Sequence, residues 1–134
     1  MRRTAAKTNS ASPQRSAPSA RPSPSKDTLD AQQVASMRAA LGDEADAIIG
    51  LFLREAADRL VRMKSLTGKD QRRALNREAH SLKSAAATFG CATLAQLSRA
   101  LEDEADTIDA GRLPARLAAL SEAYAAAKAA LTRA

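Results

Sequence analysis

Aromatic residues and cysteine are scarce in this chain of 134 residues, and each scarcity excludes a class of structure. With only Phe52, Phe89 and Tyr124 as aromatics, the core must be built from Leu, Ile, Val, Met and Ala, which favours closely packed helices. The single cysteine, Cys91, excludes an intramolecular disulfide framework and indicates a cytoplasmic protein. We expect Cys91 to be a small, partly buried residue near a helix start rather than a reactive thiol. No run of about 18 apolar residues is present, so no transmembrane span is predicted.

The net charge of +6 belongs entirely to the first 26 residues. Six of the 21 Lys and Arg residues lie there without any Asp or Glu, which leaves 15 cations against 15 acids in residues 27–134. Segment 1–26 also holds four of the five prolines and no Leu, Ile, Val or Phe, so we expect a disordered basic tail. That tail is either a solvated extension or a tether to an acidic partner, membrane or nucleic acid. The neutral remainder argues against nucleic-acid binding by the folded domain.

Residues 27–134 show helical periodicity and no alternating β-branched pattern, so the predicted fold class is all-α. Asp27 or Thr28 is the expected cap of the first helix, and Asp70 that of the third. The five predicted helices span residues 29–41, 43–66, 70–90, 91 or 93 to 110, and 113 to about 131. Their short links predict an antiparallel up-down four-helix bundle from the last four, with the short first helix laid across one end.

His80, the only histidine, lies on the third predicted helix. At about 100° per residue, it points about 140° away from the apolar face of that helix. That face carries Leu75, Ala79, Leu82, Ala86 and Phe89, whereas the residues within about 60° of His80 are Arg73, Asn76, Arg77, Lys83, Ser84 and Ala87. A neutral imidazole is a nucleophile, Lys83 is placed to contact a phosphoryl group on it, and the small Ser84 leaves room for that group.

Other interpretations of His80 carry different chemistry. A lone histidine on a helix is more often an ordinary surface residue. No Cys or carboxylate stands three or four residues away, so a metal site is not predicted. The chain has no nucleophile elbow and no glycine-rich phosphate loop, so neither a hydrolase nor a kinase is expected.

The segment around His80 resembles the signature of histidine-containing phosphotransfer (HPt) domains of multistep phosphorelays. The matching residues are His80, Ser81, Leu82, Lys83 and Ser84, followed by Gly90, Leu94, Leu97, Leu101 and Glu102. The resemblance covers roughly residues 29–132 and departs from the family at Ser84, where glycine is most frequent.

The resemblance implies a role for each matched polar residue and for the glycine. His80 would be phosphorylated, Lys83 would steady the phosphoryl oxygens, and Gly90 would serve the turn out of the helix. Glu102 falls at the position where the family often has a polar side chain that orients the imidazole from the neighbouring helix. Counting from Gly90 also places Glu102 and His80 at about the same level of an antiparallel pair, although a solvated acid is an equal alternative.

The resemblance also implies a phosphorelay intermediate, not an enzyme with its own kinase site. Its partners would be receiver domains of response regulators and a sensor or hybrid histidine kinase, with Mg²⁺ bound in the receiver and no cofactor in this chain. No membrane partner is expected, and the protein is expected to be a monomer. The residues predicted to help dock a partner are Ile48, Leu51, Arg73, Asn76, Arg77 and Ala87. Burial of Ile48 and Leu51 under the first helix is an alternative, as is a helical adaptor that binds such partners without being phosphorylated.

Overall fold

The computed structural model describes residues 28–133, so the predicted tail at 1–26 lies outside the described residues. Within that range there is no strand, and the all-α prediction is confirmed. The helices are α2 (Ala31–Leu41), α3 (Ala45–Lys64), α4 (Arg72–Thr88), α5 (Ala92–Glu104) and α6 (Leu113–Arg133), with 3₁₀ turns at Gly42–Glu44 and Lys69–Gln71. None of the helices in this part of the chain is both long and apolar enough to cross a membrane.

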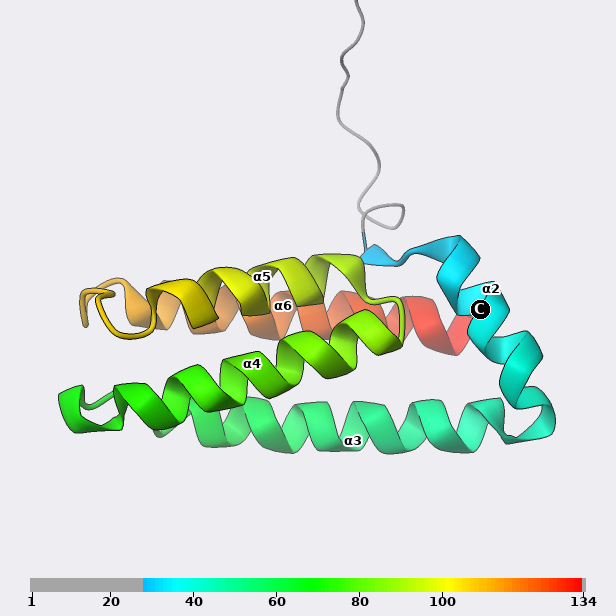
Figure 1. Ribbon diagram of the computed structural model, residues 1–134, viewed down its shortest axis with the longest axis horizontal. Helices are drawn as coiled ribbons and strands as arrows, with labels where there is room; N and C mark the ends of the chain where they lie inside the picture. The colour runs from blue at the N-terminus through cyan, green and yellow to red at the C-terminus, as the bar shows by residue number, and fades with distance from the viewer. Residues whose placement is uncertain (1–27, 134) are drawn as a thin grey trace, which may run out of the picture.

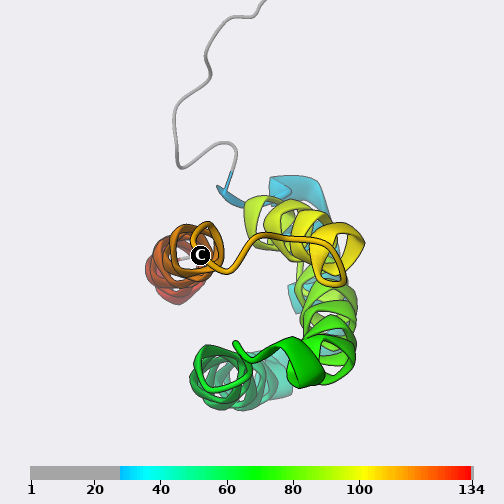
Figure 2. The same cartoon turned by 90° about the vertical axis from the view of Figure 1, so that its left-hand side faces the viewer.

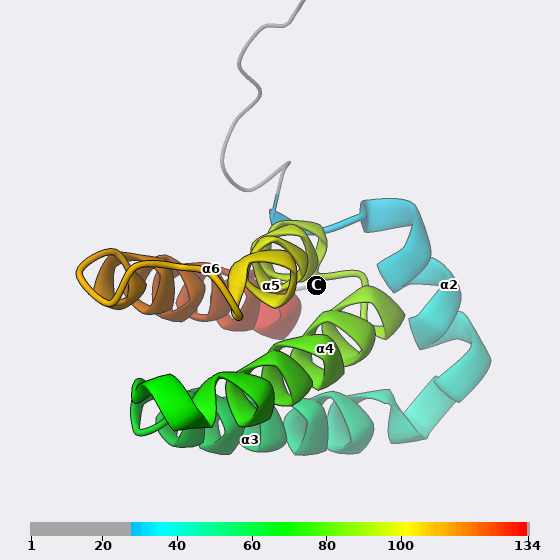
Figure 3. The same cartoon turned by 60° about the vertical axis from the view of Figure 1, so that its left-hand side comes forward.

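Helices α3 to α6 form an antiparallel bundle, and α2 crosses one of its ends (Figure 1). Seen along the bundle, α4 lies between α3 and α5, while α6 packs against both α3 and α5 (Figure 2). Helix α2 covers the end where α4 turns into α5 (Figure 3). This is the predicted arrangement, and it follows from long amphipathic helices joined by short links.

The core is built mostly from leucine and alanine, as the scarcity of aromatics requires. The predicted stripe of α3 is buried, and it consists of Ile49, Phe52, Ala56, Leu60 and Met63. Phe89 is only half-buried, but its ring stacks on that of Phe52 with centroids 4.4 Å apart. The Tyr124 hydroxyl donates to the main-chain oxygen of Leu53 at 2.8 Å. Burying a leucine contributes roughly 1.5–3 kcal/mol relative to leaving it exposed, so this core is the main favourable contribution to folding.

Two predicted helix caps are wrong. Helix α2 begins later than predicted because Asp30, rather than Thr28, is its N-cap: the Asp30 carboxylate accepts from the Gln33 N–H at 3.1 Å. Asp27 lies outside the described residues. Asp70 does not cap α4, because the chain enters that helix through a 3₁₀ turn in which Gln71 Oε1 accepts from the Gly68 N–H at 3.0 Å. A side chain that reaches back across the turn therefore replaces the expected cap.

Helix α5 ends at Glu104, six residues before the predicted end at residue 110. A side chain of α4 bonds to carbonyl groups just past this end. Arg72 donates to the main-chain oxygens of Ala105 and Ile108 at 3.0 and 2.7 Å. Ala105 and Ile108 are nevertheless buried, as the apolar pattern predicts. The apolar periodicity thus continues past the end of the helix.

Cys91 is completely buried, and burial raises the pKa of its thiol to about 12. Because the thiolate is the reacting species, the native protein should react with an aromatic disulfide reagent at pH 8 on the order of 1000-fold more slowly than the denatured chain. Absorbance of the released thiolate measures both rates. Equal rates for native and denatured protein would contradict the burial of this thiol.

Candidate functional site

The turn between α4 and α5 sets the relative level of the two helices. Gly90 has a positive φ of 74°, and the N–H groups of Gly90 and Cys91 donate to the main-chain oxygens of Ala87 and Ala86 at 3.2 and 2.8 Å. This pair of bonds is a Schellman motif, in which a left-handed glycine ends the helix. The structure therefore places Gly90 at the turn out of α4, and α5 runs back alongside the histidine-bearing helix.

His80 and Lys83 share one carboxylate on α5. The His80 Nδ1 lies 2.7 Å from Glu102 Oε2, and the Lys83 Nζ lies 2.7 Å from Glu102 Oε1. The His80 side chain is 57% exposed, whereas that of Glu102 is 19% exposed. The sequence placed His80 and Glu102 level with each other, and the structure brings them into contact. It also places Lys83 against Glu102, which the sequence did not suggest.

The electrostatics of this cluster determine which imidazole nitrogen carries the hydrogen and which holds a free lone pair. Hydrogen bonds from Lys83 and then from His80 hold the pKa of the Glu102 carboxyl below its usual range, against a smaller effect of burial. An ionised carboxylate only accepts hydrogen bonds, so His80 Nδ1 must carry the hydrogen. In the neutral ring, Nε2 then holds the free lone pair.

An open hollow of about 560 Å³ lies beside the cluster, between α4 and α5. Its lining residues are Lys83, Ser84, Ala87, Ala95, Gln96, Arg99, Glu102 and Asp103. Its lining holds two cations, Lys83 and Arg99, and two carboxylates, Glu102 and Asp103, so its formal charge is zero. Gln96 and Arg99 were not predicted to lie at this site, although their three-residue spacing with Glu102 was an available signal. Among residues 28–133, no group of three or more His, Cys, Asp or Glu side chains could hold a metal ion.

The six residues predicted to dock a partner fall into two groups. Leu51 is 48% exposed, so α2 does not bury it, and Ile48 is half-buried. Arg73, Arg77 and Ala87 are exposed. Asn76 differs from them, because its amide donates to the main-chain oxygen of Glu102 at 2.7 Å. The structure therefore engages Asn76 within the domain.

A comparison with protein-family models matches residues 47–133 to the Hpt domain. Among solved structures, the fold is similar to the crystal structure of histidine-containing phosphotransfer protein B (HptB) from Pseudomonas aeruginosa PAO1. That match has a TM-score of 0.75 and 23% sequence identity, and it covers 81% of this chain and 94% of the other. No curated protein matches the chain. Because the family match spans more than half of the sequence, the chain belongs to the Hpt domain family, whose function is histidine phosphotransfer in phosphorelay signalling.

Proposed function

We propose that His80 is the phosphorylated residue: it accepts a phosphoryl group at Nε2 from a receiver-domain aspartate or a hybrid kinase and passes it to a response regulator. The observation that carries this proposal is the Glu102 carboxylate, which lies 2.7 Å from both His80 Nδ1 and Lys83 Nζ. It orients an exposed imidazole and holds a cation beside it. The family consists of phosphocarriers rather than kinases, so the partners supply the remaining chemistry.

In the transfer step, the histidine loses no proton. The Nε2 lone pair attacks phosphorus, the P–N bond forms, and the bond from phosphorus to the aspartyl oxygen breaks, which releases a carboxylate. Nδ1 keeps its hydrogen, so the ring gains positive charge. The ionised Glu102, 2.7 Å away, stabilises that charge because it is already in place before the reaction.

The neighbours of His80 accommodate the product. Lys83 is one turn away and already borders the hollow, so a small movement from Glu102 would bring its ammonium group to the phosphoryl oxygens. Ser84 is exposed and small, which keeps the approach to Nε2 open. We assign no cofactor to this chain, and place Mg²⁺ in the partner receiver domain, where it would neutralise phosphoryl oxygens.

We propose that the domain acts as a monomer in the cytoplasm and docks its partners through the surface around His80. The charge of this surface suits an acidic partner site. The exposed Arg73 and Arg77 extend the positive charge along α4, and the exposed Leu51 with Ala87 offers apolar contact. The direct test incubates the full chain with phosphorylated receiver domains of candidate response regulators and maps the transferred label. Label on His80 is the expected result. Absence of label on His80 with all candidate receiver domains and hybrid kinases that are tested would overturn the proposal.

Ionisation of Glu102 should make its contribution to stability depend on pH. Its folded-state pKa is lowered, so the contribution is complete above the unfolded-state value of about 4.3 and is lost as pH falls through the folded-state value. Glu102→Ala should therefore be less stable than the wild type at pH 7, and this difference should shrink towards pH 2.5. Urea unfolding at several pH values measures it. Asp103→Ala, which removes an exposed acid from the same turn, is the control, and a difference independent of pH would contradict the ionised contact.

A further inference from the structure

We infer that Asn76 is a positioning residue for phosphotransfer, acting through Glu102; this inference rests on the proposed role of His80. Asn76 lies on α4, one helical turn before His80, and is half-buried. Its Nδ2 donates to the main-chain oxygen of Glu102 at 2.7 Å. Glu102 is therefore held twice: its carboxylate contacts His80 and Lys83, and its main chain is bonded to Asn76.

The place of this bond in α5 explains why it matters. Helix α5 ends at Glu104, so Glu102 is in the last turn, where carbonyl groups have no partner within the helix. The Asn76 amide supplies that partner for Glu102. Helix ends fray unless such groups are satisfied, and a fraying last turn would carry the Glu102 side chain away from His80.

Helix α4 presents its polar contacts to α5 at four-residue steps. Asn76 bonds to the Glu102 main chain and His80 to the Glu102 carboxylate, both in the last turn of α5, while Arg72 bonds to main-chain oxygens just after that helix. This spacing places all three on one face of α4. Removing the middle contact leaves the carboxylate tied to α4 only through the two side chains that it is meant to orient.

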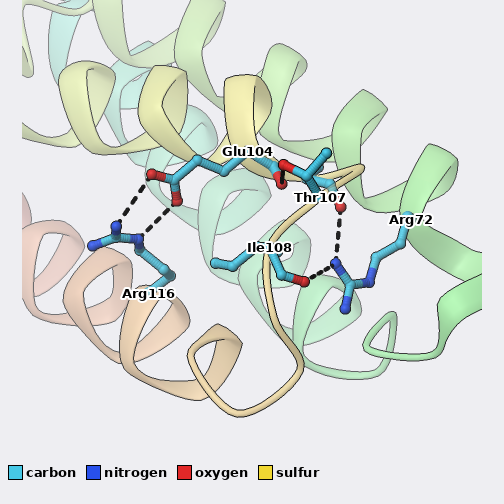
Figure 4. Close-up of polar contacts among 6 residues, drawn as sticks. Arg72, Glu104, Thr107, Ile108 and Arg116 are labelled. Carbon is cyan, nitrogen blue, oxygen red and sulfur yellow. Dashed lines mark hydrogen bonds and ion pairs between the residues drawn. The ribbon is translucent and has the colours of Figure 1, made fainter.

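Arg72 provides a control on the same face of α4, one turn before Asn76, where its side chain bonds just past the end of α5 (Figure 4). Its Nη1 donates to the main-chain oxygens of Ala105 and Ile108, and the nearby Glu104 carboxylate accepts from Arg116 at 2.9 and 3.1 Å (Figure 4). These bonds also join α5 to other elements, but none of them involves Glu102. Arg72→Ala therefore removes bonds between α4 and the segment that follows α5, and it removes no bond to Glu102.

The experiment compares Asn76→Ala with Arg72→Ala. Both variants should unfold at lower urea concentration than the wild type. Only Asn76→Ala should slow phosphoryl acceptance from a phosphorylated receiver domain, by about 10-fold, and only it should raise the pKa of the Glu102 carboxyl towards its usual range, as measured by NMR titration. Unchanged acceptance and an unchanged Glu102 pKa in Asn76→Ala would overturn the inference, as would equal effects from Arg72→Ala.

A double-mutant cycle separates positioning from a general loss of structure. In the Glu102→Ala background, Asn76→Ala should slow acceptance no further, because the group that it positions is gone. Asn76→Gln, which keeps the amide donor, should retain more activity than Asn76→Ala. An additive loss in the double variant would contradict the inference. If the wild type accepts no phosphoryl group at all, the proposed function fails, whereas the NMR titration of Glu102 still decides whether Asn76 positions it.

Discussion

His80→Gln should abolish acceptance of a phosphoryl group from a phosphorylated receiver domain while leaving receiver binding within a few-fold of the wild type. Glutamine is uncharged and of similar length. Its amide N–H can still donate to the Glu102 carboxylate, which lies 2.7 Å from Nδ1 of the histidine that it replaces. It has no basic lone pair that could attack phosphorus, so labelling should fall at least about a thousandfold. The variant thus removes the nucleophile and preserves the surface.

The measurement follows label on the wild type and the variant, together with receiver affinity. A phosphohistidine is labile in acid and stable in base, which distinguishes it from a phosphoserine on the neighbouring Ser81 or Ser84. Lys128→Gln is a suitable control, because it changes an exposed residue of α6, which carries none of the predicted docking residues, and should keep the label. Equal labelling of His80→Gln would sink the assignment of His80. Tight receiver binding by a wild type that never becomes labelled would instead favour the adaptor.

The sequence was sufficient to predict the helices and the direction of His80, since both depend on local periodicity. The apolar residues of α4 recur at three- and four-residue steps, and Leu75, Ala79, Leu82 and Ala86 are buried as this predicts. The same phase turns His80 to the surface, where its side chain is 57% exposed. Gly90 marks the turn between α4 and α5, so counting residues on either side of it predicted that Glu102 and His80 lie side by side.

Contacts between helices decided what the sequence left open. Near the end of α5 at Glu104, side chains of α4 bond to main-chain oxygens, and no residue pattern within α5 predicts these bonds. For the same reason Asn76 looked like a surface residue beside His80, although its amide is bonded to the Glu102 main chain. Lys83 was expected beside a phosphoryl group, and in the structure it contacts Glu102. The helical periodicity of the sequence predicts the direction in which a side chain points. The atom to which that side chain bonds depends on the neighbouring helix.

Gly90→Ala should destabilise the domain by about 2–4 kcal/mol, because two effects act together. The φ of 74° disfavours any residue with a Cβ, at about 1–2 kcal/mol. A Cβ at this position would also lie 2.8 Å from Val34 Cγ2, on the helix that covers the end of the bundle. The Gly90 main-chain oxygen accepts from the Asp30 N–H at 2.7 Å, so the turn cannot move without disturbing the start of α2.

Val34→Ala separates these two effects, because it removes the Cγ2 atom that a Cβ at position 90 would meet. In the Val34→Ala background, Gly90→Ala should show only the backbone cost of about 1–2 kcal/mol, so the two substitutions together should be less destabilising than the sum of their separate effects. Urea unfolding of the two single variants and the double variant measures this coupling. Additive losses would mean that Val34 yields freely, and that α2 is not held against the turn that aligns Glu102 with His80.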